Sequence, residues 1–160
     1  MIQRPLLILL ILIAFFASCS NLPRDPKKTL QHVLESKRLR VGLVEHPPWV
    51  VKINREPAGV EVELVKRFAA DLGATPDWSW GGEQEQMEAL EHYKLDLLIG
   101  GFTSETAWST YVGLTSPYTD QKQVMASPPG ENGFIKRLDD FLYQHRAEVK
   151  SLLQQEESSR

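Results

Sequence analysis

The residues that could do chemistry are few and scattered. The chain has one cysteine, Cys19, and four histidines whose spacing matches no metal site: His32, His46, His92 and His145. Glu45 precedes His46, but neighbours in sequence rarely form a working acid–base pair. No Gly-x-Ser-x-Gly turn is present, and Cys19 is better explained by lipid attachment than by nucleophilic chemistry. We therefore predict no enzyme activity, no catalytic residue, no cofactor and no metal site.

Cys19 closes a segment typical of protein export. After a cationic start, an apolar run over residues 6–17 is too short for a comfortable transmembrane helix. Ala17 and Ser18, two small residues, stand directly before Cys19, which is the pattern of a lipoprotein signal. The alternative is an ordinary secreted protein in which Cys19 lies near the cleavage point. As the sole cysteine it has no intramolecular disulfide partner, so we predict a signal peptide over 1–18 and fatty acylation (palmitate type) of Cys19.

The rest of the chain has the length of one domain, which we place at residues 29–154. Residues 19–28 are polar with two prolines and predict a tether, and residues 155–160 predict a polar tail. By resemblance to enterobacterial lipoproteins, Ser20 rather than Asp after the cysteine favours the periplasmic side of the outer membrane. The chain has 18 Lys and Arg against 21 Asp and Glu, mixed along its length, which argues against a nucleic-acid partner.

The apolar pattern changes period several times in the first two thirds of the domain. Short β-rich runs predict strands, and apolar stripes at intervals of three and four predict helices. The elements expected are a helix over 29–36, a strand over 39–44, a helix over 60–72, a strand over 75–80, a helix over 83–93 and a strand over 95–99. This alternation predicts parallel strands joined by right-handed crossovers, with ligands bound at the carboxyl ends of the strands.

The pattern is weaker in the last third. Residues 112–118 and 121–126 are expected to form two short strands, followed by a turn-rich break over 127–133. One apolar stripe then predicts a single long helix over 134–154, with Asn132 as its N-cap.

Five short segments carry a resemblance to a known family: Leu39-Arg40-Val41-Gly42, Pro47-Pro48-Trp49, Gly59 to Leu64, Leu95 to Thr103 and Ser116-Pro117-Tyr118. In order and spacing they resemble the periplasmic solute-binding proteins of family 3, the receptors of polar amino-acid ABC transporters. The resemblance implies an α/β three-layer sandwich with a mostly parallel sheet, the type II periplasmic binding protein fold. Family members are clamshells of two lobes. In this chain only a few residues separate Tyr118 from residues 121–126, which resemble the strand that returns to lobe one. A whole second lobe does not fit between them, so the chain resembles lobe one alone.

The resemblance also implies a ligand crevice formed by Trp49, Gly101, Thr103 and Trp108. Family members place an aromatic side chain against the ligand at the position of Trp49, and the turn with Gly101 and Thr103 offers hydrogen bonds. An arginine that clamps a carboxylate belongs at the position of Trp108, and an indole cannot replace its guanidinium fork. The alternatives are an aromatic plug at the domain edge, a simple turn, and aromatic surface for protein contacts. Asp96 is interpreted as structural.

Two functions follow from these observations. We predict a lipid-anchored, extracytoplasmic solute-binding protein that serves ABC-type uptake of a small polar solute through a permease. Because no second lobe closes over the ligand, we expect affinity no better than micromolar. The alternative is a degenerate single lobe that acts as a protein–protein interaction or homodimerisation module without ligand transport.

Overall fold

The structure of the chain, a computed structural model, describes residues 25–158. The predicted signal peptide, the lipidation site Cys19, the first part of the predicted tether and residues 159–160 lie outside this range. No helix among the described residues is long and apolar enough to cross a membrane.

The centre of the fold is a five-stranded sheet in the order β4-β1-β5-β7-β6. Its strands are β1 (Arg38–Leu43), β4 (Thr75–Trp80), β5 (Leu97–Ile99), β6 (Gly113–Leu114) and β7 (Ala126–Ser127). β1 runs parallel to both β4 and β5, whereas β7 is antiparallel to β5 and β6. Parallel neighbours need crossover helices, and these are α3 (Val60–Asp71) and α4 (Glu83–Glu91).

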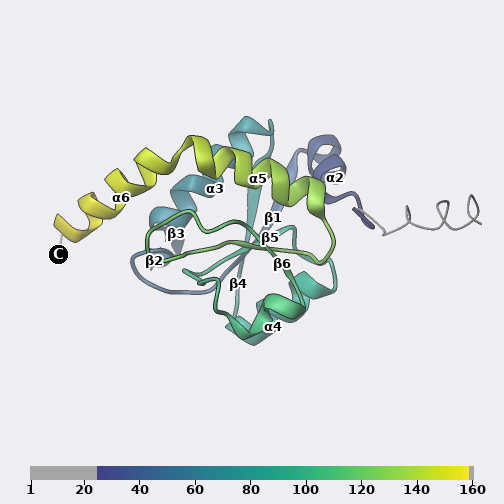
Figure 1. Ribbon diagram of the computed structural model, residues 1–160, viewed down its shortest axis with the longest axis horizontal. Helices are drawn as coiled ribbons and strands as arrows, with labels where there is room; N and C mark the ends of the chain where they lie inside the picture. Colours follow the sequence, from purple (N-terminus) through teal and green to yellow (C-terminus); the bar gives the residue numbers. More distant parts are fainter. Residues whose placement is uncertain (1–24, 159–160) are drawn as a thin grey trace, which may run out of the picture.

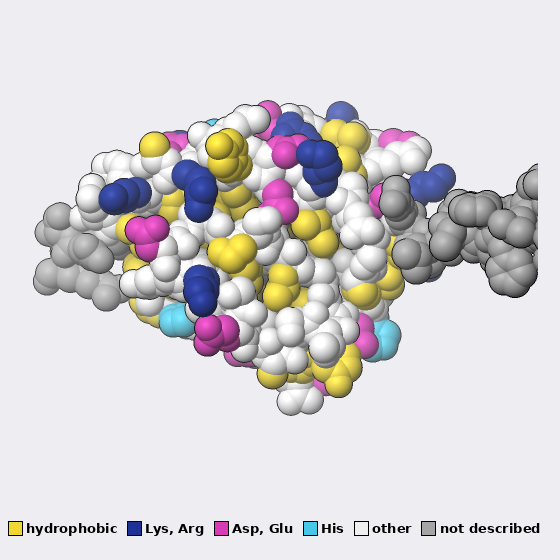
Figure 2. All heavy atoms as spheres, viewed as in Figure 1, with side chains coloured by type: hydrophobic (Ala, Val, Ile, Leu, Met, Phe, Trp, Pro, Cys, Tyr) yellow, Lys and Arg dark blue, Asp and Glu magenta, His cyan; other side chains and the backbone are white. Residues whose placement is uncertain are grey.

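Helices cover both faces of this sheet. α3, α2 (Thr29–Ser36) and α5 (Asn132–Gln144) lie on one face, and α4 lies on the other (Figure 1). Side chains of β5 divide accordingly: Leu97 and Ile99 join the core under α3 and α5, and Leu98 joins a second core under α4. The three-layer, mostly parallel fold predicted for one lobe is therefore confirmed. Charges of both signs are spread over the face shown in Figure 2.

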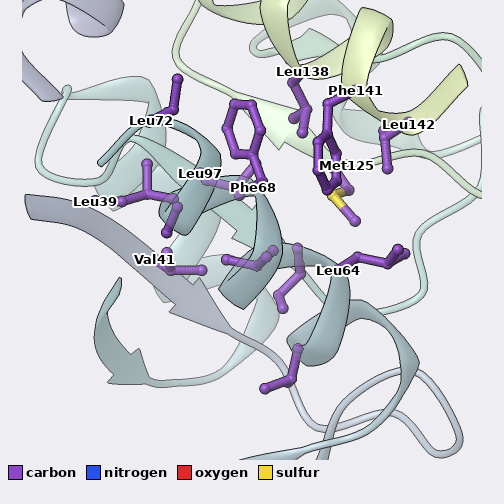
Figure 3. Packing of buried hydrophobic residues seen from close by; sticks show 14 of the residues in the cluster. Leu39, Val41, Leu64, Phe68, Leu72, Leu97, Met125, Leu138, Phe141 and Leu142 are labelled. Carbon is purple, nitrogen blue, oxygen red and sulfur yellow. The ribbon is translucent and has the colours of Figure 1, made fainter. Parts of the chain in front are cut away.

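The larger core is centred on aromatic side chains from α3 and α5. Phe68 of α3 is fully buried, and its ring centroid lies 5.9 Å from that of Phe134 and 5.3 Å from that of Phe141. Figure 3 shows Phe68 and Phe141 above Leu64 and the strands, with Met125 beside them. Burial of such rings contributes several kcal/mol in total, so this contact holds the C-terminal part of the chain to the first crossover.

Asp96 has the structural role expected from the sequence. Its carboxylate is buried, and its Oδ2 accepts hydrogen bonds from the backbone N–H of Arg40 at 2.8 Å and from the Arg40 Nε at 3.0 Å. The guanidinium also reaches Oδ1 at 2.5 Å. This two-point contact joins β1 to the entry of β5.

Three local features differ from the sequence-based expectations. The C-terminal stripe forms two helices, α5 and α6 (Arg146–Ser158), because His145 leaves the helical path, stacks on Phe141 and bonds to its carbonyl through Nδ1. α6 continues into the residues predicted as a polar tail. The strands expected over 112–118 and 121–126 are only the short β6 and β7.

An unpredicted hairpin follows the first strand. Its strands are β2 (Val51–Ile53) and β3 (Glu56–Ala58), and both residues of its turn, Asn54 and Arg55, have positive φ. A two-residue turn of this kind suits the twist of a hairpin.

The starts of α2 and α5 are each capped by a carboxylate that lies just before the other helix. Asn132 is the first residue of α5 rather than its N-cap, and the N–H of Gly133 donates to Asp25 Oδ1 at 2.6 Å. The preceding residue, Glu131, turns its buried carboxylate to the start of α2, where the N–H groups of Lys27 and Thr29 donate at 2.7 and 2.6 Å. Residues 25–28, the end of the predicted tether, are thereby fixed to the domain.

We predict that Glu131→Ala lowers the free energy of unfolding by about 1–3 kcal/mol, because the backbone donors at the start of α2 lose a charged acceptor. Urea denaturation of the full chain measures this loss. Glu85→Ala, which removes an exposed glutamate from α4, is the control and should change stability by a few tenths of a kcal/mol. Equal effects of the two substitutions would contradict the capping role.

Candidate functional site

The loop that carries Trp49 is fixed to the start of α3. The N–H of Val60 donates to the carbonyl of Pro48 at 3.1 Å, and the N–H of Glu61 donates to the carbonyl of Trp49 at 3.0 Å. These are N–H groups that a helix start leaves without intrahelical partners. Gly59, just before the helix, has φ 110°, and a Cβ there would lie 2.6 Å from the Trp49 carbonyl oxygen. The Gly-Val-Glu sequence therefore positions the tryptophan.

The Trp49 indole packs into the domain edge. Only 5% of Trp49 is exposed, and its ring meets that of Tyr118 edge to face, with centroids 6.5 Å apart. It also lies against the turn after β5: a Cβ at Gly101 would lie 2.4 Å from the indole Cδ1, and Gly101 has φ 64°. Glycine is required at this position both for backbone conformation and for space.

A buried carboxylate lies beneath this aromatic pair. Glu61 is fully buried, and its Oε2 accepts hydrogen bonds from the N–H groups of Gly100 and Gly101, each at 2.9 Å. The Tyr118 hydroxyl donates to its other oxygen, Oε1. His46 approaches the same turn, with its Nδ1 2.9 Å from the Gly100 carbonyl oxygen. Glu61 thus joins α3, the turn after β5 and the loop after β6.

Burial changes the acid–base properties of this pair. Loss of water around Glu61 raises the pKa of its carboxyl above the usual value, although the hydrogen bonds from Tyr118 and the two glycines oppose the rise. Burial also raises the pKa of Tyr118 well above its usual value, and the neighbouring negative charge of Glu61 adds to that rise. The Tyr118 hydroxyl therefore stays protonated and serves as a hydrogen-bond donor.

A cavity of about 470 Å³ opens next to the Trp49–Tyr118 pair. It lies between the loop from Tyr118 to Gln123 and one face of α6. Its lining residues are Trp49, Tyr118, Thr119, Asp120, Gln121, Gln123, Arg146, Val149, Lys150 and Leu153. The volume is in the range that holds small-molecule ligands, and the lining combines apolar, amide and charged groups.

The four ligand residues predicted from the resemblance do not gather in one place. Trp49 lines the cavity. Gly101 lies behind Trp49, and its N–H is taken by Glu61. Thr103 forms a β-bridge with Gln123, which lines the cavity. Trp108 is in the 3-10 helix η1 (Ala107–Thr110), away from the cavity, and its Nε1 donates to a carboxylate of α4 at 3.0 Å. Whether these four residues contact a ligand stays a prediction.

Several residues around the site were missed by sequence reasoning. Glu61 and Tyr118 were recognised only as members of two of the segments that carry the family resemblance. Arg146 and Lys150 gave no signal, because a basic pair on an exposed helix face is ordinary in a sequence. Their place in the cavity depends on how α6 packs: Val149, between them, is 2% exposed and belongs to the larger core.

The fold has a counterpart among known proteins. The family described as "Bacterial extracellular solute-binding proteins, family 3" matches residues 39–158. The chain belongs to this family, whose members are extracytoplasmic. A comparison with curated proteins gave no match.

Solved structures similar to this chain include a single domain and other amino-acid-binding proteins. The arginine-bound form of domain 1 from TmArgBP of T. maritima is 20% identical, with 71% of this chain and 97% of that chain covered and a TM-score of 0.66. An ancestral amino acid-binding protein, described as a precursor of cyclohexadienyl dehydratase, is 13% identical (79% and 98% covered, TM-score 0.72). An arginine-bound amino acid ABC transporter substrate-binding protein from Streptococcus pneumoniae is 9% identical (81% and 98%, 0.71). At these identities the likeness concerns the fold.

The buried position of Glu61 predicts a specific pH dependence of stability. A carboxyl whose pKa is raised on folding contributes stability that is complete below its unfolded pKa, about 4.5, and is lost as the pH rises through the folded value. Glu61→Gln cannot ionise and keeps an acceptor for the glycine N–H groups. We therefore expect the unfolding free energy of the wild type, relative to Glu61→Gln, to fall as the pH rises above about 4.5.

Urea denaturation across this pH range measures the difference. Glu63→Gln is the matched control, because it removes the charge of a partly exposed glutamate in the same turn of α3. If the stability difference between the wild type and the Glu61→Gln variant stays constant with pH, or follows the control, Glu61 is not buried as described.

Proposed function

We propose that this chain is a lipid-anchored, extracytoplasmic binding protein for a small polar solute, working with ABC-type uptake. The observation that carries the proposal is the cavity beside Trp49 in a domain of the solute-binding family. Trp49 and Tyr118 give it a rigid aromatic wall, and the Tyr118–Gln123 loop and α6 give it polar groups. Gly101 supports the wall from behind, and Thr103 holds the loop through Gln123.

A single lobe is a reasonable unit for such binding. The similar structure of domain 1 from TmArgBP is described as arginine-bound, so one domain of this fold can hold a small solute. In this chain the cavity is open on one side, and a solute there keeps part of its hydration. We therefore expect a Kd of about 1 μM or weaker. A Kd of about 1 μM corresponds to a binding free energy of about −8 kcal/mol.

We predict that the full chain, purified in detergent, binds at least one member of a panel of amino acids, sugars, organic anions and polyamines in a calorimetric screen. Leu153→Trp should weaken that binding at least tenfold, because the larger side chain occupies the cavity that Leu153 lines. Leu34→Trp is the matched control, since Leu34 is 40% exposed on α2 and does not line this cavity.

The screen can fail in two ways. No binding by any member of the panel would reject a solute-binding function. Binding that Leu153→Trp leaves unchanged would place the solute elsewhere, and Trp108→Ala would then test the crevice expected from the resemblance.

The lipid anchor is proposed from the Ala17-Ser18-Cys19 sequence. Each buried CH₂ of an acyl chain contributes about 0.8 kcal/mol, so several chains on one cysteine give stable membrane attachment. The polar residues after Cys19 separate the lipid from the first residues fixed to the domain, which begin at Asp25.

We predict that Cys19→Ala moves the protein from the membrane fraction of its bacterial host to the soluble fraction. Mass spectrometry of the wild-type protein should show a chain that begins at Cys19 and carries acyl groups. Ser20→Ala, which keeps the cysteine, is the control and should remain membrane-bound. Retention of Cys19→Ala in the membrane fraction would contradict lipid anchoring.

A further inference from the structure

The cavity beside Trp49 has two basic side chains on one wall. Arg146 and Lys150 are four residues apart on α6, one helical turn, so they lie on the same face. Val149, buried in the larger core, fixes that face of the helix in place. Figure 2 shows basic side chains over the end of the molecule where α6 runs.

Neither base forms an ion pair with a side chain of residues 25–155. The ion pairs among these residues include neither Arg146 nor Lys150, whereas Glu148 of the same helix is paired with Arg67 of α3. The one acidic side chain in the lining is Asp120. The lining thus carries an excess of one positive charge, in a chain whose net charge is −3.

Several other polar groups of the lining already have hydrogen-bond partners. The Tyr118 hydroxyl donates to Glu61, the Thr119 hydroxyl donates to the Gln123 side-chain oxygen, and the Gln123 amide nitrogen donates to Gln121 at 3.5 Å. A solute entering the cavity therefore meets two cations, one carboxylate, the amide of Gln121 and an apolar wall. Guanidinium and ammonium groups bind carboxylates through charge-assisted hydrogen bonds.

We propose that the cavity takes a small organic anion whose carboxylate is held by Arg146 and Lys150. The apolar part of the solute lies against Trp49, Val149 and Leu153. Asp120, at the rim, disfavours a second negative charge on the solute, so the preferred ligand carries one. This assignment rests on the proposed function and specifies the chemical class of its ligand.

Titration of the full chain in detergent with benzoate and with benzamide tests the assignment by NMR. The two probes share a ring and differ in the carboxylate. We expect benzoate to shift the backbone amide signals of Val149 and Lys150, and benzamide to bind at least tenfold more weakly. Equal binding of the two probes would overturn the proposal. Displacement of benzoate by equimolar inorganic phosphate would also overturn it, because the site would then select any anion.

Two double variants test which basic side chains bind benzoate. Arg146→Gln combined with Lys150→Gln should weaken benzoate binding at least tenfold and leave benzamide binding unchanged. Lys66→Gln combined with Lys136→Gln is the matched control: it removes the same charge from exposed positions on α3 and α5. An unchanged benzoate affinity in the α6 variant, or an equal loss in the control, would overturn the proposal.

The anion assignment and the proposed solute-binding function are rejected by different results. A neutral or cationic solute whose binding is blocked by Leu153→Trp but not by the α6 double variant would overturn the anion assignment and leave the proposed function standing. The absence of binding by every solute tested would overturn both.

Discussion

The buried carboxylate of Glu61 connects three segments that are far apart in the chain. This carboxylate accepts hydrogen bonds from the turn after β5 and from Tyr118 in the loop after β6. The backbone N–H of Glu61 donates to the carbonyl of Trp49. A carboxylate out of water is tolerated only when such partners are present. The start of α3, the end of β5 and the Trp49 loop are therefore held in one arrangement. The aromatic wall of the cavity depends on that arrangement, because Trp49 and Tyr118 both contact this acid or its neighbours.

The two remaining walls come from later parts of the chain. The loop from Tyr118 to Gln123 is short and crosses directly from β6 towards β7, and α6 faces it across the cavity with Val149 and Leu153. A one-lobe protein must enclose a solute with its own loops and helices. Here the C-terminal helix supplies both the apolar contact and the basic groups. In the proposed site, solute recognition would depend on the break at His145, which sets the direction of α6 relative to α5.

Much of the fold could be predicted because its elements have strong periodicity. The apolar stripe of α3 indicates a helix that packs on a sheet. The continuous apolar run of β5 indicates a strand that is covered on both faces. The hairpin at Asn54 was missed because each of its strands is only three residues long. The candidate site was harder to predict from the sequence. Burial decides whether Glu61 is an ordinary first-turn acid or an internal support, and burial depends on tertiary contacts. The same holds for Arg146, whose significance comes only from the loop that α6 faces.

The reciprocal caps at Asp25 and Glu131 determine how the domain can sit relative to an anchor. They fix the point where the N-terminal segment leaves the domain, beside α2, and Figure 1 places that point at the end opposite to α6. The chain from Cys19 to Asp25 spans at most about 20 Å when fully extended. An acylated Cys19 would thus keep the α2 pole close to the lipid surface and turn the α6 pole outward. The cavity would then sample the aqueous space beyond the membrane, where dissolved solutes arrive by diffusion.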